Sequence, residues 1–382
     1  MKWSLDPTRG LLDVLGHPET HFPTIQVAGT NGKGSTCAFL AADLRARGFR
    51  VGVYTSPHLV SVRERIVVDG VPISEEAFAE WTGILKPHIE RLDASFFEAT
   101  TVIAFADFAA RGVDIAVIEV GLGGRLDATT VLTPLVSVVT KIARDHTEYL
   151  GEELTSIARE KAGIAKPGVP FVTGERDARV GAVLLEEAGA RGASPLVAVD
   201  TTRAPTGPLE LRGRHQDANA WVALGALNAL PPPFGPVGDV WPESFGRAYV
   251  PARFEMRGRW IFDVAHNPDG AQVLAQTLAE YAPPRPRAAL MAVLADKDYR
   301  GMIRALEREI DEFVFTTAPS APAARSWALS EVSIPESVRA AVEPDFDRAL
   351  ERVRRAATAV VTGSFYTVGD ALARLPGFAP LG

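Results

Sequence analysis

A glycine-rich segment near the start of the chain carries the clearest chemical signal. Residues 27–36 read VAGTNGKGST. Glycines permit positive φ, which turns successive backbone N–H groups toward an anion, and a helix that begins here adds the positive end of its dipole. Lys33 could reach the terminal phosphates of a nucleotide, and Ser35 could cap the helix or approach a metal ion. The spacing departs from the common Walker form, since Val27 replaces its first glycine and Gly34 follows the lysine, but a phosphate-binding loop remains the prediction.

Further along the chain, charged side chains follow the apolar runs that are expected to be strands. Glu119 comes near the end of the run 114–120, and Asp145 and His146 follow the run 134–140. Ligands of α/β sheets bind at the carboxyl ends of the strands. A carboxylate beside a phosphate needs a compensating cation, and Mg²⁺ prefers oxygen ligands. The sequence therefore predicts a metal-assisted phosphate site at this edge of the sheet.

Two other segments have ordinary interpretations that compete with a functional one. Residues 121–126 read GLGGRL and suggest a dinucleotide fingerprint, but Leu126 occupies its third glycine position and Glu119 would face the pyrophosphate. A nicotinamide site here is therefore disfavoured. Lys161 lies in an amphipathic helical pattern, where a lysine is usually solvated or in a surface ion pair.

The elements that must position these residues alternate between strands and helices, which predicts right-handed crossovers and mostly parallel sheets. The strands expected in the first part of the chain cover 24–27, 51–54, 114–120 and 134–140, and the helices cover 35–47, 75–91, 99–110 and 152–163. After a proline-rich break at 230–237, further strands are expected at 260–264, 288–294, 312–316 and 359–362. We predict an α/β protein with a P-loop-type, mostly parallel domain at 1–250 and a smaller Rossmann-like domain at 251–382.

Composition narrows the classes of protein. The chain has 382 residues with a net charge of −7, which favours two globular domains and argues against a general binder of nucleic acid or membranes. One cysteine, Cys37, excludes an intrachain disulfide and a cysteine-based zinc cluster. No uncharged apolar run approaches the about 20 residues that span a bilayer. We expect a cytoplasmic protein without nucleic-acid or membrane partners.

Short segments in a fixed order narrow the function further. They read GTNGKGST at 29–36, TSPHL at 55–59, RERI at 63–66, SFFE at 95–98, EVGLGGRLD at 119–127, EKAGI at 160–164, PARFE at 251–255, DVAHNP at 263–268 and DKD at 296–298, with Asp145-His146 and Leu150-Gly151 between them. Together they resemble the dihydrofolate synthase / folylpolyglutamate synthase family of the Mur ligase superfamily, from residue 23 to residue 370.

The resemblance implies an ATP-dependent amide ligase. ATP would phosphorylate the carboxylate of dihydropteroate or of a folate, and the amine of L-glutamate would attack the acyl phosphate. It further implies ATP and Mg²⁺, as two ions, as cofactors, an ATP- and folate-binding first domain, a glutamate-ligase second domain and a monomer.

The resemblance also assigns residues by position. Those expected to bind the nucleotide are Gly32, Lys33, Gly34, Ser35, Asn219, Arg253 and Asp263. Those expected to hold metal are Ser56, Glu119, His146 and Lys161, the last as a carbamylated amine. Those expected on the pterin side are Ser95, Leu126, Asp127 and Ala128. Those expected to act in catalysis are Lys33, Lys161 and His266.

The chain departs from the family pattern in places, and other functions stay open. Ala252 replaces the usual glycine before Arg253, Ser95 stands where threonine is often found, and 1–22 is a compressed N-terminal segment. Another Mur-type ligase is one alternative, although only 28 residues precede Gly29, too few for a UDP-sugar domain. A P-loop kinase and a non-catalytic nucleotide-binding protein are others. The sequence leaves open whether dihydropteroate, tetrahydrofolate or both accept glutamate.

Overall fold

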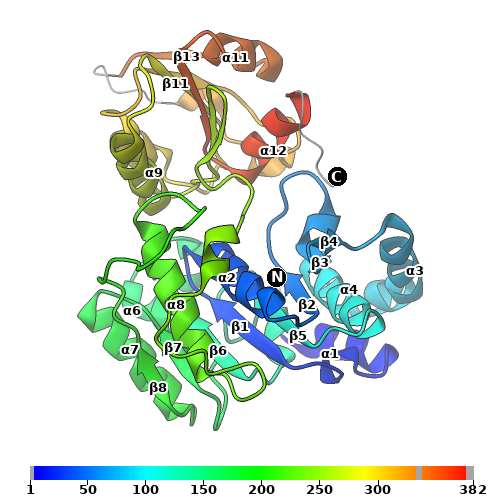
Figure 1. The fold of residues 1–382 in the computed structure, drawn as a ribbon. Helices are drawn as coiled ribbons and strands as arrows, with labels where there is room; N and C mark the ends of the chain where they lie inside the picture. Colours follow the sequence, from blue (N-terminus) through cyan, green and yellow to red (C-terminus); the bar gives the residue numbers. More distant parts are fainter. Residues whose placement is uncertain (1–3, 333–337, 376–382) are drawn as a thin grey trace. The chain divides into compact units, whose positions relative to one another are not determined.

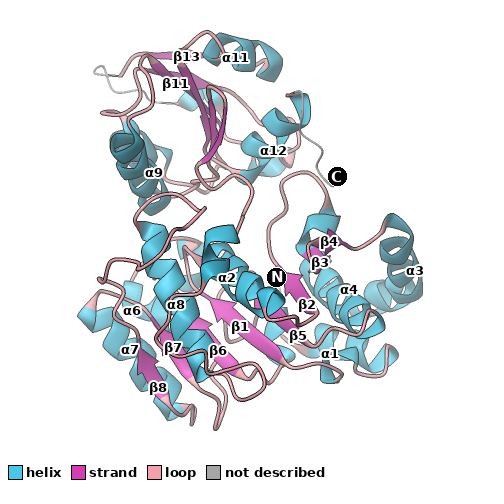
Figure 2. Ribbon diagram, viewed as in Figure 1, coloured by secondary structure: helices cyan, strands magenta, loops and turns pink. Residues whose placement is uncertain are grey.

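The computed structural model describes residues 4–332 and 338–375 and divides the chain into two compact units (Figure 1). Unit 1 contains Met1–His58, Val62–Glu210 and Gln216–Tyr249. Unit 2 contains Val250–Gly382 together with two short excursions of the chain, Leu59–Ser61 and Leu211–His215. Each unit has a sheet whose strands are flanked by helices (Figure 2).

Unit 1 is built on an eight-stranded sheet in the order β4-β3-β2-β5-β1-β6-β7-β8. The strands are β1 Thr24–Ala28, β2 Val51–Tyr54, β3 Ile66–Val68, β4 Val71–Pro72, β5 Ile115–Glu119, β6 Val136–Val139, β7 Phe171–Thr173 and β8 Leu196–Ala198. All neighbours from β2 to β8 pair in parallel, whereas β3 and β4 form an antiparallel edge on β2. The predicted mostly parallel sheet is thus confirmed.

The helices of unit 1 follow the predicted pattern with shifted ends. They are α1 Asp6–Val14, α2 Lys33–Ala46, α3 Glu75–Leu92, α4 Phe96–Ala110, α5 Thr147–Leu150, α6 Leu154–Ala162, α7 Ala178–Ala190 and α8 His215–Ala229. The helix predicted from residue 99 begins at Phe96 because Ser95 and Glu98 form a capping box. The Ser95 hydroxyl accepts from the backbone N–H of Glu98, and the Glu98 carboxylate accepts from that of Ser95.

Alternation along β5 explains why Glu119 faces the phosphate loop. Ala116 and Ile118 pack into the core formed with α1, α3 and α4. Since successive side chains of a strand point to opposite faces, Glu119 shares the other face with Val117. The helix α2 packs against β1, β2 and β5, and the Glu119 carboxylate lies near its first turn.

Unit 2 has a six-stranded sheet in the order β13-β12-β11-β14-β10-β9, parallel except for β9. Its strands are β9 Glu255–Arg257, β10 Trp260–Phe262, β11 Arg287–Met291, β12 Glu312–Phe315, β13 Ala340–Val342 and β14 Thr358–Thr362. Its helices are α9 Pro268–Tyr281, α10 Tyr299–Leu306, α11 Phe346–Val353 and α12 Phe365–Arg374. The four strands predicted in this region are all present.

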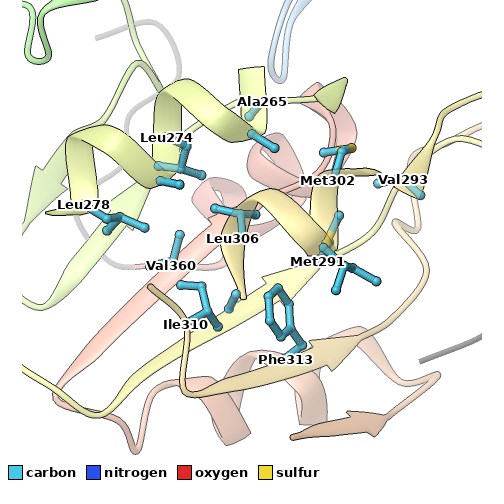
Figure 3. Close-up of a cluster of buried hydrophobic side chains, with 14 of the residues drawn as sticks. Ala265, Leu274, Leu278, Met291, Val293, Met302, Leu306, Ile310, Phe313 and Val360 are labelled. Carbon is cyan, nitrogen blue, oxygen red and sulfur yellow. The ribbon is translucent and has the colours of Figure 1, made fainter. Parts of the chain in front are cut away.

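Two apolar layers hold the sheet of unit 2. On one face, Leu274 and Leu278 of α9 and Leu306 of α10 pack toward Phe313 and Val360 (Figure 3). On the other face, the intervening strand residues pack with α11 and α12. Since alternate residues of each strand pack on opposite faces, a sheet covered on both faces needs continuous apolar strands, as the sequence has here.

In the part of the chain that the structure describes, no helix is both long enough and apolar enough to cross a bilayer.

Candidate active site

The predicted phosphate loop connects β1 to α2 and is fastened to the end of β6. The backbone N–H of Thr30 donates to the carbonyl of Lys141 at 2.8 Å, and its hydroxyl donates to the carbonyl of Ala143 at 3.0 Å. The Thr140 hydroxyl donates to the carbonyl of Asn31 at 2.8 Å. These bonds hold the loop from outside, so the backbone N–H groups at the start of α2 form a preshaped anion site.

Gly32 is needed in this loop for two reasons. Its φ of 92° lies in the left-handed region that favours glycine, and it is the last residue before α2. A Cβ here would also collide with the side-chain oxygen of Asn219. Asn219 is buried in α8, where its amide donates to Gln216 at 2.9 Å. The structure thus places Asn219 directly against the loop, as the nucleotide assignment requires.

Lys33 and Glu119 meet at the first turn of α2. Lys33 Nζ donates to the carbonyl of Thr30 at 3.1 Å and lies 3.9 Å from Glu119 Oε1. Glu119 Oε2 accepts from the backbone N–H of Ser56 at 3.1 Å, and it would lie 3.8 Å from a Cβ on Gly34. Three of the predicted residues, Lys33, Ser56 and Glu119, are therefore together.

The donors at this turn fit a magnesium ion that is shared with phosphate. In residues 4–332 and 338–375, no three His, Cys, Asp or Glu side chains form a ready-made metal cage. Mg²⁺ usually takes one or two carboxylates and completes its shell with phosphate oxygens and water. Glu119 supplies such a carboxylate beside the phosphate loop. The hydroxyl of Thr36, in the same turn of α2, is buried without a hydrogen-bond partner in the described chain.

Lys161 is an unusual lysine because it is only 5% exposed near the end of α6. Burial and, to a smaller extent, the charge of Lys33 lower the pKa of its amine to about 7, against the opposing influence of Asp145, Asp127 and Glu160. The expectation of a surface lysine is therefore wrong. At neutral pH a substantial fraction of the amine is uncharged and nucleophilic.

His146 follows β6, as predicted, and begins α5 with φ 51°. Its Nε2 lies 3.9 Å from a carboxylate oxygen of the buried Asp145. The charge of Asp145 also acts on Lys161, so the carboxylate connects the two predicted metal ligands electrostatically.

The four predicted substrate residues line one cavity of about 380 Å³. Its wall is formed by Ser4, Pro7, Leu92, Asp93, Ala94, Ser95, Phe97, Glu98, Leu122, Leu126, Asp127 and Ala128. The size and the mixture of apolar surface with a few polar groups are typical of a site for a small molecule.

The carboxylate of Asp127 is occupied by its own turn. It accepts from the backbone N–H groups of Gly121 and Leu122, each at 3.0 Å, and from the backbone and hydroxyl of Thr129 at 2.9 and 2.6 Å. Burial raises the pKa of this carboxyl, and those bonds oppose the rise. Gln26 in β1 donates to the same Thr129 hydroxyl at 2.9 Å. The residue shapes the cavity wall, and a substrate contact stays a prediction.

The residues predicted from the second domain lie in unit 2. Asp263 accepts from the backbone N–H groups of Phe254 and Ala265, each at 2.9 Å, and burial raises the pKa of its carboxyl against the influence of Arg253. The Nε of Arg253 is buried without a partner in the described chain. The ring Nδ1 of His266 lies 2.9 Å from the carbonyl of Val264.

The structure also shows the surroundings of Ala252, the residue before Arg253 that replaces the usual glycine of the family. Ala252 has φ 56°, in the left-handed region where glycine is favoured. Its side chain is fully buried in the core of unit 2. Packing of the methyl group offsets the backbone penalty.

Sequence reasoning missed Arg65. Its Nε donates to Nδ1 of His58 at 2.9 Å, and its guanidinium lies 5.3 Å above the ring of Phe96. Burial and the charge of Arg65 lower the pKa of His58. The RERI segment contains Arg65 but suggests no role for it, because the sequence does not predict the strand β3, which begins at the next residue.

Two domain families match the chain. The Mur ligase middle domain matches residues 27–190, and the glutamate ligase domain of Mur ligases matches residues 252–365. The dihydrofolate synthase/folylpolyglutamate synthase of Bacillus subtilis is 32% identical, and the alignment covers 98% of this chain and 96% of that protein. The chain belongs to this family of Mur ligases.

Solved structures of the family have the same fold. A folylpolyglutamate synthase of Mycobacterium tuberculosis, complexed with ADP and AMPPCP, is 34% identical with a TM-score of 0.85, over 97% of this chain and 95% of that one. A bifunctional folylpolyglutamate synthase/dihydrofolate synthase of Yersinia pestis, complexed with AMPPNP and a manganese ion, is 30% identical with a TM-score of 0.83, over 98% and 93%. The predicted fold class and family are confirmed.

Proposed function

We propose that this protein is an ATP-dependent ligase that joins L-glutamate to the carboxylate of dihydropteroate, of tetrahydrofolates, or of both. One observation carries the proposal. The end of β5 supplies Glu119, 3.9 Å from Lys33 at the phosphate loop, and the segment that follows it contributes Leu122 and residues 126–128 to the wall of the 380 Å³ cavity. One short segment thus joins a phosphate site to a cavity for a small acceptor, and the match of residues 252–365 to a glutamate ligase domain favours a ligase over a kinase or a nucleotide switch.

The chemistry begins with a carboxylate that is a poor electrophile and that repels the γ-phosphate. Lys33 would neutralise the transferring phosphoryl group, and the N–H groups at Gly32, Gly34 and Ser35 would hold the phosphates in line. Glu119 and Ser56 would hold Mg²⁺, which supplies charge neutralisation when bound. The amine of glutamate then attacks the carbonyl carbon of the acyl phosphate, the amide C–N bond forms, and phosphate leaves as the amine loses a proton.

Lys161 would join this site as a carbamate. An uncharged lysine amine adds to CO₂, forming one C–N bond and releasing one proton, and the product is an anion. Because the pKa of the Lys161 amine is about 7, the uncharged amine is available at neutral pH. The carbamate would face Lys33 and, together with His146, would provide ligands for a second Mg²⁺.

We assign the residues of unit 2 to the remaining partners. Arg253 and Asp263 are proposed to contact the nucleotide, and His266 to contact glutamate or the acyl phosphate. The match of residues 252–365 to a glutamate ligase domain supports this division. A monomeric, cytoplasmic enzyme is proposed on the sequence alone.

The test is an assay of the purified protein with ATP, Mg²⁺ and L-glutamate, comparing dihydropteroate with tetrahydrofolate as acceptor. We expect ADP release that depends on glutamate, together with a glutamyl conjugate detected by mass spectrometry. A phosphorylated acceptor that forms independently of glutamate would favour the kinase alternative. If neither acceptor yields a conjugate, the proposed function is wrong.

A further inference from the structure

Arg65 lies at the same edge of the unit 1 sheet as Glu119. The carbonyl of Arg65 accepts from the backbone N–H of Thr55 at 3.1 Å. The next row of the sheet pairs Ile66 with Tyr54, and Tyr54 with Ile118. Arg65 and Glu119 therefore stand two strands apart at the same level, and a strand spacing of about 4.8 Å separates their backbones by about 10 Å.

Among the residues that the structure describes, the charge of Arg65 has no anionic partner. The residue is only 8% exposed, and buried arginines are almost always paired. Across residues 4–332 and 338–375, its side chain makes one hydrogen bond, from Nε to His58, and no ion pair. Arg63, two residues earlier, shows the ordinary arrangement, with Nη1 at 3.1 Å from Glu75.

The surroundings hold the guanidinium in one orientation. The ring of Phe96 lies under its face, and Nδ1 of His58 accepts the hydrogen bond from Nε–H. The two terminal nitrogens are left as a planar pair, the arrangement that binds a carboxylate through parallel hydrogen bonds. Phe96 is itself 58% exposed, so the stack faces solvent-accessible space.

The neighbours of this stack lead to the acceptor site. Phe96 stands between Ser95 and Phe97, which line the 380 Å³ cavity. Phe97 also packs against Tyr54 with ring centroids 6.0 Å apart. The cation thus stacks on a residue whose two chain neighbours line the cavity, and it lies on the same sheet edge as Glu119, toward which the carboxylate end of an acceptor would extend from the cavity.

We propose that Arg65 binds a carboxylate of the pteroate or folate acceptor, with Phe96 supporting the guanidinium and His58 orienting it. The inference rests on the proposed function and adds a residue that determines acceptor binding. The ligand is either the carboxylate that becomes phosphorylated or the neighbouring α-carboxylate of a folate glutamate.

The test compares Arg65→Met and Arg65→Lys with Arg63→Met as the matched control. For Arg65→Met we expect the acceptor KM to rise about tenfold to a hundredfold, the range for a hydrogen bond to a charged group. Arg65→Lys should fall between it and the wild type, and Arg63→Met should stay within about twofold. The unfolding midpoint of Arg65→Met should equal or exceed that of the wild type, since an unpaired buried charge is removed.

The two acceptors identify the carboxylate. Dihydropteroate has one carboxylate, so equal losses with dihydropteroate and tetrahydrofolate mean that Arg65 binds the reacting group. A loss with tetrahydrofolate alone assigns it to the α-carboxylate. An unchanged KM for both, or a loss that merely follows a lowered unfolding midpoint, overturns the proposal.

A binding measurement separates this inference from the proposed function. Pteroate and its carboxamide are titrated into the wild type and Arg65→Met in the presence of AMPPNP and Mg²⁺. We expect the wild type to prefer pteroate by about tenfold and the variant to show no preference. A preference of the wild type for pteroate without any turnover would reject the proposed ligase but keep Arg65 as a site for a carboxylate. If the wild type shows no preference for pteroate, the proposed role of Arg65 is wrong.

Discussion

Two buried arginines, one in each unit, are satisfied in different ways. Arg287, at the start of β11, is 4% exposed; its Nε donates to the carbonyl of Pro283 at 2.9 Å and its Nη1 lies 2.6 Å from Glu309. Arg65, at the carboxyl edge of the unit 1 sheet, is also buried, and among the described residues it has an imidazole and an aromatic ring as partners instead of a carboxylate. The charge of Arg287 is paired within the fold, whereas we propose that the charge of Arg65 pairs with a bound ligand.

The lysines of unit 1 extend this comparison. Lys166 donates to the carbonyl of Thr130 at 2.7 Å and fastens the turn behind the cavity. Lys33 and Lys161 instead lie at the ligand edge, where burial and, secondly, the charge of Lys33 lower the pKa of Lys161. Cations gathered at one place against their mutual repulsion indicate anionic ligands there.

The largest effect should come from Lys33→Ala. We expect kcat to fall about 10²- to 10³-fold, because the ammonium acts mainly on charge that develops during phosphoryl transfer. Nucleotide binding should change less. Steady-state ADP release and AMPPNP titration measure both effects, with Lys86→Ala on the exposed side of α3 as the control. Normal turnover in the variant would remove Lys33 from the mechanism.

Arg287→Met should separate stability from activity. The substitution removes the bonds of Arg287 to Glu309 and to the carbonyl of Pro283, while Arg285 stays 3.6 Å from Glu309, and we expect a loss of about 2 kcal/mol in the free energy of unfolding. The acceptor KM of the folded enzyme should not change. Urea unfolding followed by fluorescence provides the measurement. A stable variant with a raised KM would erase the distinction between the two arginines.

Lys161→Ala should lose activity that small carboxylates such as acetate partly restore, by about tenfold, if the carbamate acts as an anionic ligand. In the wild type stripped of CO₂, reactivation at a fixed CO₂ concentration requires the uncharged amine. Its fraction rises with pH through the pKa of about 7, far below the ordinary value of 10.5. Reactivation that begins only near pH 10, or the absence of acetate rescue, would count against the carbamate.

Two serine caps in unit 1 offer the finest comparison. Ser74 accepts from the backbone N–H of Ala77 at 3.1 Å, and Ser95 accepts from that of Glu98 at 3.3 Å. Alanine at either position should cost about 1 kcal/mol of stability. Only Ser95→Ala should also raise the acceptor KM, by about fivefold, because Ser95 lines the cavity. Equal KM values for the two variants would remove Ser95 from the acceptor site.

Much of the fold follows from the sequence because its central strands are continuous apolar runs. The runs at 114–120 and 134–140 become β5 and β6, and their carboxyl ends place Glu119 and His146. The strands β7 and β8 were missed, since each has three residues and β8 is largely exposed. Such short strands are decided by their neighbours and not by local pattern.

The residues of the site could be predicted where a sequence motif fixes the backbone conformation. They could not be predicted where tertiary packing determines the burial and the partners of a side chain. The segment GTNGKGST gives the loop, and the order of segments gives the four residues of the cavity. No sequence pattern shows that Asp127 accepts from four donors of its own turn, that Lys161 is buried, or that Arg65 has no carboxylate partner within the described part of the chain. Those facts depend on residues distant in the sequence.

The central claim is that a carboxylate of the acceptor is phosphorylated before glutamate attacks it. Dihydropteroate or tetrahydrofolate with ¹⁸O in the reacting carboxylate tests this directly, in a reaction with ATP, Mg²⁺ and L-glutamate. We predict that each phosphate released carries one acceptor oxygen, seen by mass spectrometry or by the isotope shift in the ³¹P spectrum. Glutamyl conjugate formed with unlabelled phosphate would contradict the acyl phosphate and the account built on it.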